Sequence, residues 1–222
     1  MEYIIEVNDV VKKFKDVTVL DHVSLKVEQG TICGLVGRNG SGKTVLMKVI
    51  CGFILPDSGQ VTVDGRQIGK DCDFPKDTGV IIENPGFSQY ISGAKNLRNL
   101  ASINKKITQE EIVKVMELVG LNAQDRKWVS KYSLGMRQRL GIAQAIMEGQ
   151  SLLILDEPMN GLDQEGVEDM RKLFQNLREQ GKTILLASHS REDIAMLCDA
   201  VYEMEHGVIR RKDVENGSMQ FV

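Results

Sequence analysis

The amino-acid sequence predicts an α/β fold with a mostly parallel central sheet, an N-terminal antiparallel β region and an inserted α-helical subdomain. Three observations support this prediction. A glycine-rich turn at 37–44 stands between a short apolar strand and a helix. Fully apolar segments at 152–155 and 184–187 alternate along the chain with segments that have a helical pattern. A parallel sheet covered on both faces by helices requires this arrangement. The intervening residues 87–150 lose the strand pattern and take on a helical one.

Strands are expected where apolar and polar residues alternate, or where a short run is apolar throughout. The alternating kind dominates residues 3–36, which are therefore expected to form a small β-rich region. Glycine-containing turns separate several of these segments, including one at 84–86. The expected strands are residues 3–7, 23–27, 31–36, 60–65, 79–83, 152–155, 184–187 and, as the last strand, 201–204.

Helices are expected where apolar residues recur at a spacing of three and four. Thr108 and Glu111 form a capping box that begins one of them, and Gly120 ends it. Another begins after Ser133 and turns Leu140, Ala143 and residues 146–147 inward. The remaining expected helices are residues 45–50, 167–177 and 194–197.

The composition is that of an ordinary globular protein, with 42% hydrophobic and 27% charged residues in a chain of 222. The net charge of −3 argues against a general nucleic-acid binder. The longest apolar runs fall far short of the roughly 18 residues that span a bilayer, and the N-terminal residues do not resemble a signal peptide. Any membrane role is therefore expected to depend on a partner.

Four cysteines are scattered along the chain without a metal-ligand spacing. Cys33 and Cys51 stand in apolar surroundings, so buried free thiols are expected. This usage is typical of a reducing, cytosolic compartment.

The glycine-rich turn fits the phosphate-binding pattern G-x-x-x-x-G-K-S/T. Glycines let the backbone approach phosphates closely, and its N–H groups then form an anion nest beside the positive end of the following helix. Lys43 is expected to reach the β- and γ-phosphates, and the Thr44 hydroxyl to bind Mg²⁺. The turn predicts a P-loop NTPase that binds a nucleotide through Gly37-Arg38-Asn39-Gly40-Ser41-Gly42-Lys43-Thr44.

Three polar side chains follow buried strands. Asp156 and Glu157 come directly after 152–155, and His189 follows the strand at 184–187 by two residues. Because the carboxyl ends of parallel strands line the ligand crevice, Asp156 is expected to hold Mg²⁺ in the Walker B role. Glu157 points elsewhere and is expected to be the general base, while His189 contacts the γ-phosphate. The expected catalytic residues are Lys43, Glu157 and His189.

One further segment resembles a family signature. Residues 132–140 read Tyr-Ser-Leu-Gly-Met-Arg-Gln-Arg-Leu, which is similar to L-S-G-G-Q followed by R-Q-R, just before Walker B. Together with the P-loop, this resembles the ATP-binding-cassette (ABC) ATPases, the nucleotide-binding subunits of ABC transporters. Leu134 and Met136 depart from the usual glycine and glutamine. Residues 160–163, Asn-Gly-Leu-Asp, resemble the D-loop of that family, usually S-A-L-D.

The resemblance implies that two copies sandwich two ATP molecules head to tail. Ser133, Gly135 and Met136 of one copy would then close in trans over the ATP held by the other. Phe14 falls where the family places an aromatic residue that stacks on adenine, and Asp163 falls in the D-loop at the dimer contact. The second subunit would be an identical chain or a close paralogue.

The likeness covers the whole chain and implies a single ABC ATPase domain, 1–222. Residues 1–86 and 151–222 would form the β-subdomain and the RecA-like core, and about 87–150 the helical signature subdomain. ATP and Mg²⁺ are the implied cofactors. A separate transmembrane permease, docked on 85–93, would hold the chain at the cytoplasmic face of the cell membrane.

Glu83 stands where the family usually has the glutamine of the Q-loop. A carboxylate can ligate Mg²⁺, so Thr44, Asp156 and Glu83 are the expected metal ligands. Gln89 is the alternative candidate, although it lies well beyond the strand. The string Ile-Glu-Asn-Pro-Gly-Phe at 82–87, with the Ser-Leu-Gly-Met of the signature, resembles the bacitracin- and lantibiotic-type exporters.

Two other functions fit the sequence less well. A soluble ABC ATPase acting on nucleic acid or ribosomes usually has tandem cassettes or a coiled-coil insert, and this chain has one cassette, no heptad run and no basic patch. A P-loop kinase or GTPase does not fit the signature, and the guanine-reading string Asn-Lys-x-Asp is missing. The sequence therefore favours the ATPase subunit of a transporter, and the family likeness implies an exporter of peptide antibiotics or similar amphipathic compounds.

Overall fold

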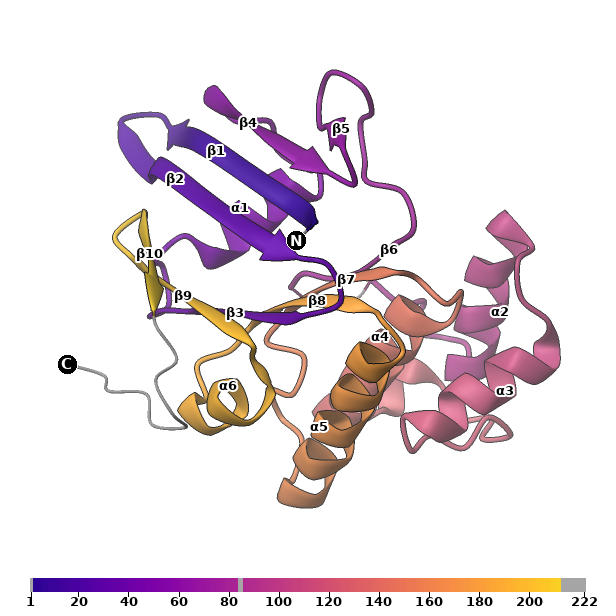
Figure 1. The fold of residues 1–222 in the computed structure, drawn as a ribbon. Helices are drawn as coiled ribbons and strands as arrows, with labels where there is room; N and C mark the ends of the chain where they lie inside the picture. Colours follow the sequence, from indigo (N-terminus) through magenta and orange to yellow (C-terminus); the bar gives the residue numbers. More distant parts are fainter. Residues whose placement is uncertain (1, 84–85, 213–222) are drawn as a thin grey trace.

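The computed structural model describes residues 2–83 and 86–212, and it contains two sheets (Figure 1). The smaller sheet is antiparallel, in the order β2-β1-β4-β5. Along β2, Leu20, Val23, Leu25 and Val27 are buried while most of the residues between them face outward. This alternation confirms the predicted N-terminal β region. Its strands are β1 (Tyr3–Phe14), β2 (Val17–Glu28), β4 (Ser58–Val63) and β5 (Arg66–Gln67).

The larger sheet has the order β10-β9-β3-β8-β7-β6. All its neighbouring strands are parallel except β10, which pairs antiparallel with β9. The fully apolar strands β3 and β8 are buried along their whole length, as their sequences predict. A mostly parallel central sheet is thereby confirmed. Its strands are β3 (Ile32–Val36), β6 (Thr78–Ile81), β7 (Leu152–Asp156), β8 (Thr183–Ala187), β9 (Ala200–Glu205) and β10 (Val208–Lys212).

Helices cover both faces of this sheet. Helix α1 (Lys43–Ile50) lies between the two sheets and buries Leu46, Met47 and Val49 in the core that they share. On the opposite face lie α4 (Leu134–Ile146), α5 (Gln164–Glu179) and α6 (Arg191–Leu197) (Figure 1). The carboxyl ends of β3, β7 and β8 therefore open onto the starts of helices, where a ligand crevice is expected.

The chain between β6 and β7 is helical, with α2 (Gly93–Asn104), α3 (Gln109–Leu118), the 3₁₀ turn Val129–Lys131 and α4. The capping box is confirmed, since Thr108 Oγ1 accepts from Glu111 N and the Glu111 carboxylate accepts from Thr108 N. Leu140 and Ala143 of α4 are fully buried, as expected.

Several elements differ from the sequence predictions. Strand β5 and the 3₁₀ turn were not predicted, and β6 ends at Ile81, so Glu83 lies beyond the strand that was expected to contain it. Helix α2 was not predicted, because its buried face consists mainly of small or polar residues with a single leucine, Leu97. The segment 201–204 is not the last strand, since β10 follows it at the sheet edge. The sequence of β10, Val-Ile-Arg-Arg-Lys, has no buried residue and so lacks the apolar pattern of a strand. Positions 84 and 85 of the predicted turn lie outside the described residues.

The cysteines are free, and burial raises the pKa of the Cys33 and Cys51 thiols to about 12. Both thiols therefore remain protonated at neutral pH, as the prediction of buried free thiols requires. Within 2–83 and 86–212, no helix has the length and apolar character needed to cross a bilayer.

Candidate functional site

Residues 37–42 connect β3 to α1 and curl the backbone into a cradle. At Gly37, with φ 154°, a Cβ atom would lie 2.3 Å from the carbonyl oxygen of Met204. At Gly42, with φ 111°, it would lie 2.9 Å from the carbonyl oxygen of Val19. Glycine is therefore required at both ends of the turn, which leaves the loop free to direct its N–H groups inward.

Two side chains in the cradle fit a bound phosphate chain. Lys43 is only 6% exposed, and its Nζ donates to the carbonyl oxygens of Gly37 at 2.6 Å and Arg38 at 3.2 Å. Ser41 Oγ is buried and has no hydrogen-bond partner among the described residues. A buried ammonium held only by carbonyl oxygens and an unpartnered hydroxyl are groups that an anionic oxygen would satisfy.

The first pair of predicted metal ligands lies in direct contact. Thr44, at the start of α1, donates its hydroxyl hydrogen to Asp156 Oδ2 at 2.6 Å, and Asp156 is the last residue of β7. A hydroxyl and a carboxylate side by side beside a phosphate cradle are oxygen donors of the kind that Mg²⁺ prefers. The residues present thus fit a magnesium ion.

Glu157 and His189 form the second pair. Glu157 Oε2 lies 2.7 Å from His189 Nδ1, and the two residues follow neighbouring strands, β7 and β8. Glu157 has φ 49°, a left-handed conformation that costs a non-glycine residue energy. Three hydrogen bonds among the described residues hold that backbone: Glu157 N donates to Ala187 O at 3.0 Å, and Glu157 O accepts from Asn160 N at 3.1 Å and from Gln138 Nε2 at 2.8 Å.

A cavity of about 540 Å³ joins these features. It contains the helix end of the P-loop, the Thr44–Asp156 pair and Glu157, and α4 contributes Leu134 and Gln138. Its lining residues are Val19, Asn39, Gly40, Gly42, Lys43, Thr44, Val45, Glu83, Leu134, Gln138, Asp156, Glu157 and Asn160. The predicted residues Lys43, Thr44, Glu83, Asp156 and Glu157 therefore share one space, whereas Gly37, Arg38, Ser41 and His189 line a neighbouring cavity of about 560 Å³.

Glu83 lines this cavity, but its carboxylate is paired with Lys48 Nζ at 2.6 Å. Lys48 lies one turn after Thr44 on α1, so Glu83 is held beside the metal pair and next to a cation. The rival Gln89 donates to the carbonyl oxygen of Phe87 at 3.0 Å and does not line the cavity.

The predicted signature residues lie at the start of α4. Ser133 is its N-cap, and its Oγ accepts from Met136 N at 3.1 Å. Gly135 packs closely on the D-loop, since an added Cβ would lie 3.1 Å from Gly161 O. Asp163 of that loop caps α5 by accepting from Gly166 N. Ser133, Gly135 and Met136 do not line the cavity of their own chain.

Phe14 lies at the end of β1 and is 44% exposed, with Lys12 Nζ 5.5 Å from its ring centroid. It is not among the residues that line the cavity, whereas Val19 of β2 is.

Sequence reasoning missed three residues that support the site: Gln138, Lys48 and Val19. Gln138 stands inside the Arg-Gln-Arg string that follows the signature, and this string was its only signal. The sequence contains no signal that would have indicated Lys48 or Val19, because their roles depend on which strands and helices meet in space.

Comparison with known proteins identifies the family. The sequence model described as "ABC transporter" matches residues 20–160, more than half of the chain. The chain belongs to the ABC transporter family. As a member it is an ATPase, the nucleotide-binding subunit of a transporter, which confirms the prediction.

Named relatives of this ABC protein include transport ATP-binding proteins. YybJ of Bacillus subtilis, an uncharacterized ABC transporter ATP-binding protein, is 44% identical over 216 residues, covering 94% of this chain and 99% of YybJ. The bacitracin transport ATP-binding protein BcrA of Enterococcus faecalis is 41% identical, covering 93% and 68%. The lantibiotic transport ATP-binding protein SrtF of Streptococcus pyogenes is 31% identical, covering 96% and 92%. The predicted likeness to this branch is confirmed.

Solved ABC cassettes have the same fold. A dimeric cassette in a post-hydrolysis state with ADP and phosphate matches with a TM-score of 0.85, covering 95% of this chain and 99% of that one at 18% identity. The ATP-binding subunit of another ABC transporter matches with a TM-score of 0.84, covering 96% and 90% at 24% identity. At these identities the likeness concerns the fold.

Proposed function

We propose that this ABC subunit binds ATP with Mg²⁺ and hydrolyses it to drive export of peptide antibiotics or similar amphipathic compounds through a separate membrane permease. The observation that carries the proposal is the meeting of Thr44 with Asp156 and of Glu157 with His189 beside the P-loop. The class of cargo rests on the names of the relatives BcrA and SrtF.

The P-loop binds the phosphates. Its backbone N–H groups and the start of α1 face the negative charge, and Ser41 Oγ is free to donate to a phosphate oxygen. Lys43 Nζ exchanges its carbonyl partners for the β- and γ-phosphates, which keeps a cation beside the transferred group. Phe14, exposed at the end of β1, offers its ring to adenine.

Thr44, Asp156 and Glu83 would hold the metal ion. A bound Mg²⁺ would supply positive charge that offsets part of the negative charge of the phosphates. For Glu83 to join the other two ligands, its carboxylate must release Lys48.

Glu157 orients the attacking water and accepts its proton. His189, hydrogen-bonded to that carboxylate through Nδ1, presents the rest of its ring to the γ-phosphoryl oxygens and stabilises their developing charge. The left-handed backbone of Glu157 is consistent with this role, because strained residues held by their surroundings are concentrated at functional sites.

A second copy completes the pocket. The start of α4 is an exposed helix N-terminus, which suits an anion supplied by another chain. Ser133, Gly135 and Met136 of one copy would close over the ATP of its partner, and Asp163 would lie at the contact. Residues 1–222 would form one ATPase domain, with about 87–150 as its helical signature subdomain.

The permease docks beside the helical insert. Tyr90 and Trp128 are 73% and 49% exposed, with ring centroids 5.9 Å apart in an edge-to-face contact. Backbone bonds from Val129 N to Ile91 O and from Ser130 N to Gln89 O join the two loops that carry them. Pro85, the first residue of the predicted docking loop, lies outside the described residues. Docking here would place the chain at the cytoplasmic face of the membrane.

Replacing Glu83 by alanine is expected to raise the Mg²⁺ concentration that half-saturates ATP hydrolysis, because one carboxylate ligand is lost. The Gln89→Ala variant is the matched control, since the Gln89 side chain donates to the Phe87 carbonyl and does not line the cavity. Titration of Mg²⁺ at fixed ATP measures both. An effect of Gln89→Ala alone would transfer the ligand role to Gln89.

Transport is tested by expressing the chain with its cognate permease in a bacitracin- and lantibiotic-sensitive host. The wild-type pair is expected to raise the inhibitory concentration of at least one of these peptides, and the Glu157→Gln pair is not. Equal sensitivity with and without the wild-type pair would refute the cargo class. Co-purification of RNA or DNA instead of a membrane protein would favour the soluble alternative.

A further inference from the structure

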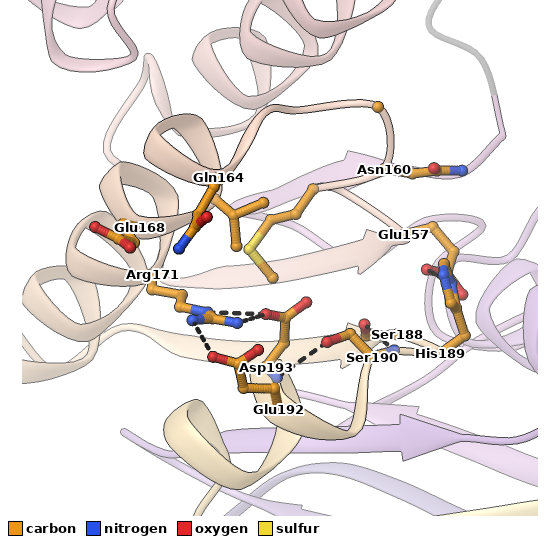
Figure 2. Close-up of a pocket in the computed structure, with 13 residues that line it drawn as sticks. Glu157, Asn160, Gln164, Glu168, Arg171, Ser188, His189, Ser190, Glu192 and Asp193 are labelled. Carbon is orange, nitrogen blue, oxygen red and sulfur yellow. Dashed lines mark hydrogen bonds and ion pairs between the residues drawn. The ribbon is translucent and has the colours of Figure 1, made fainter.

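A second cavity, of about 380 Å³, lies on the other side of Glu157 (Figure 2). It is bounded by the D-loop, the first turns of α5 and the turn that carries His189 into α6. Figure 2 shows the side chain of Arg171 extending from α5 toward the start of α6, with Glu157 and His189 at the opposite end of the cavity.

Arg171 joins the two helices through three hydrogen bonds. Its Nε and Nη2 donate to Asp193 Oδ1 at 2.8 and 2.5 Å, and its Nη1 donates to Glu192 Oε1 at 3.0 Å. The side chains of Arg171 and Asp193 are 11% and 7% exposed, whereas Glu192 is 72% exposed. Arg171–Asp193 is therefore the buried, directional contact of the group.

Asp193 connects this ion pair to residues 188–190, the turn between β8 and α6 that carries His189. Its backbone N donates to Ser190 Oγ at 3.2 Å, which caps α6, and Ser190 N donates to Ser188 Oγ at 3.1 Å. His189 stands between these two serines. The bonds thus run without a break from α5 to both residues that flank His189.

Helix α6 needs such an anchor. It has seven residues, and isolated helices of this length are unstable, so its position depends on packing and on bonds to neighbours. The His189 side chain is 66% exposed, and its hydrogen bond within the described residues is the one to Glu157. The orientation of the ring is therefore set mainly by the backbone that carries it.

We propose that Arg171 is a positioning residue for His189: through Asp193 and Ser190 it fixes the first turn of α6 so that the imidazole stays against Glu157. This inference rests on the proposed catalytic roles of Glu157 and His189. Arg171 itself does not line the cavity that contains the P-loop and the metal pair.

The same two helices supply a matched control. Arg178, two turns along α5, donates through Nη2 to Asp199 Oδ1 at 2.5 Å, just beyond the end of α6. Both variants remove an ion pair between an arginine of α5 and an aspartate at or beside α6. Arg178→Met removes the pair at the far end of α6, and Arg171→Met removes the pair at the end next to His189.

Steady-state ATP hydrolysis tests the proposal. Arg171→Met is expected to lower kcat by about 10- to 100-fold with KM for ATP changed less than about twofold, because it misplaces a catalytic group and leaves the phosphate cradle intact. Arg178→Met is expected to keep the wild-type kcat. Equal kcat values for the two variants would overturn the positioning role.

A readout of the ring itself is available because the chain has three histidines, so His189→Ala assigns its NMR signal. Arg171→Met is expected to shift the His189 Cε1–H resonance, and Arg178→Met is not. Should Arg171→Met fail to fold, the double variant Arg171→Met/Asp193→Leu removes both buried charges together and is expected to fold with the same loss of kcat. A wild-type kcat in that double variant would also contradict the proposal.

The His189→Ala variant distinguishes failure of the proposed catalytic role of His189 from failure of the proposed positioning role of Arg171. A wild-type kcat in His189→Ala would refute the proposed role of His189. A reduced kcat in His189→Ala together with a wild-type kcat and unshifted His189 resonance in Arg171→Met would refute only the role of Arg171.

Discussion

Replacing Glu157 by glutamine is expected to leave ATP binding intact and to slow hydrolysis by about 10²- to 10⁴-fold, the usual contribution of a general base. Glutamine has nearly the same shape but cannot accept the proton of the attacking water. The backbone of residue 157 is held by bonds to Ala187 O and from Gln138 Nε2, which do not involve the side chain. The geometry of the site should therefore survive the exchange.

Because ATP is bound but not cleaved, the Glu157→Gln variant is also expected to accumulate as a nucleotide-bound dimer. Single-turnover hydrolysis and light scattering with ATP measure the two effects. Glu179→Gln, at the exposed end of α5, is the control and should match the wild type. Full turnover by Glu157→Gln would show that another group is the base.

Replacing Lys43 by alanine is expected to weaken ATP binding by about 10- to 150-fold, since a hydrogen bond to a charged group contributes about 1.5–3 kcal/mol. The Lys43 ammonium is buried in the cradle and, among the described residues, donates to the Gly37 and Arg38 carbonyls, so it is available to a phosphate. Hydrolysis should fall with binding, because both depend on the same cation.

Equilibrium binding of a fluorescent ATP analogue measures the loss. Lys114→Ala, on the exposed face of α3, removes a lysine far along the chain from the cradle and should bind like the wild type. Circular dichroism controls for folding, because Lys43 is itself buried. Unchanged ATP affinity in a folded Lys43→Ala protein would contradict the phosphate role.

Much of the fold follows from sequence pattern because burial on both faces of a parallel sheet requires apolar runs. Strands β3, β7 and β8 have such runs, and they were predicted. Helix α2 and strand β10 were not, since the first buries few large side chains and the second lies exposed at an edge. Their positions are set by contacts with distant parts of the chain.

Some residues of the site could likewise be predicted from the sequence, and others could not. Asp156, Glu157 and His189 could be predicted because each stands at or just past a strand end, and parallel strands bring those ends together. The pairing of Glu83 with Lys48 and of Arg171 with Asp193 could not, because each joins residues more than twenty positions apart. No local pattern records which side chains meet across two helices.

We propose that two copies form each ATPase site, with the P-loop of one chain and Ser133–Met136 of the other. Analytical ultracentrifugation and ATPase assays over one dilution series test it most directly. The specific activity per chain is expected to rise with protein concentration in step with the dimer fraction. A chain that sediments as a monomer in ATP and still hydrolyses it at the full specific rate would contradict the claim.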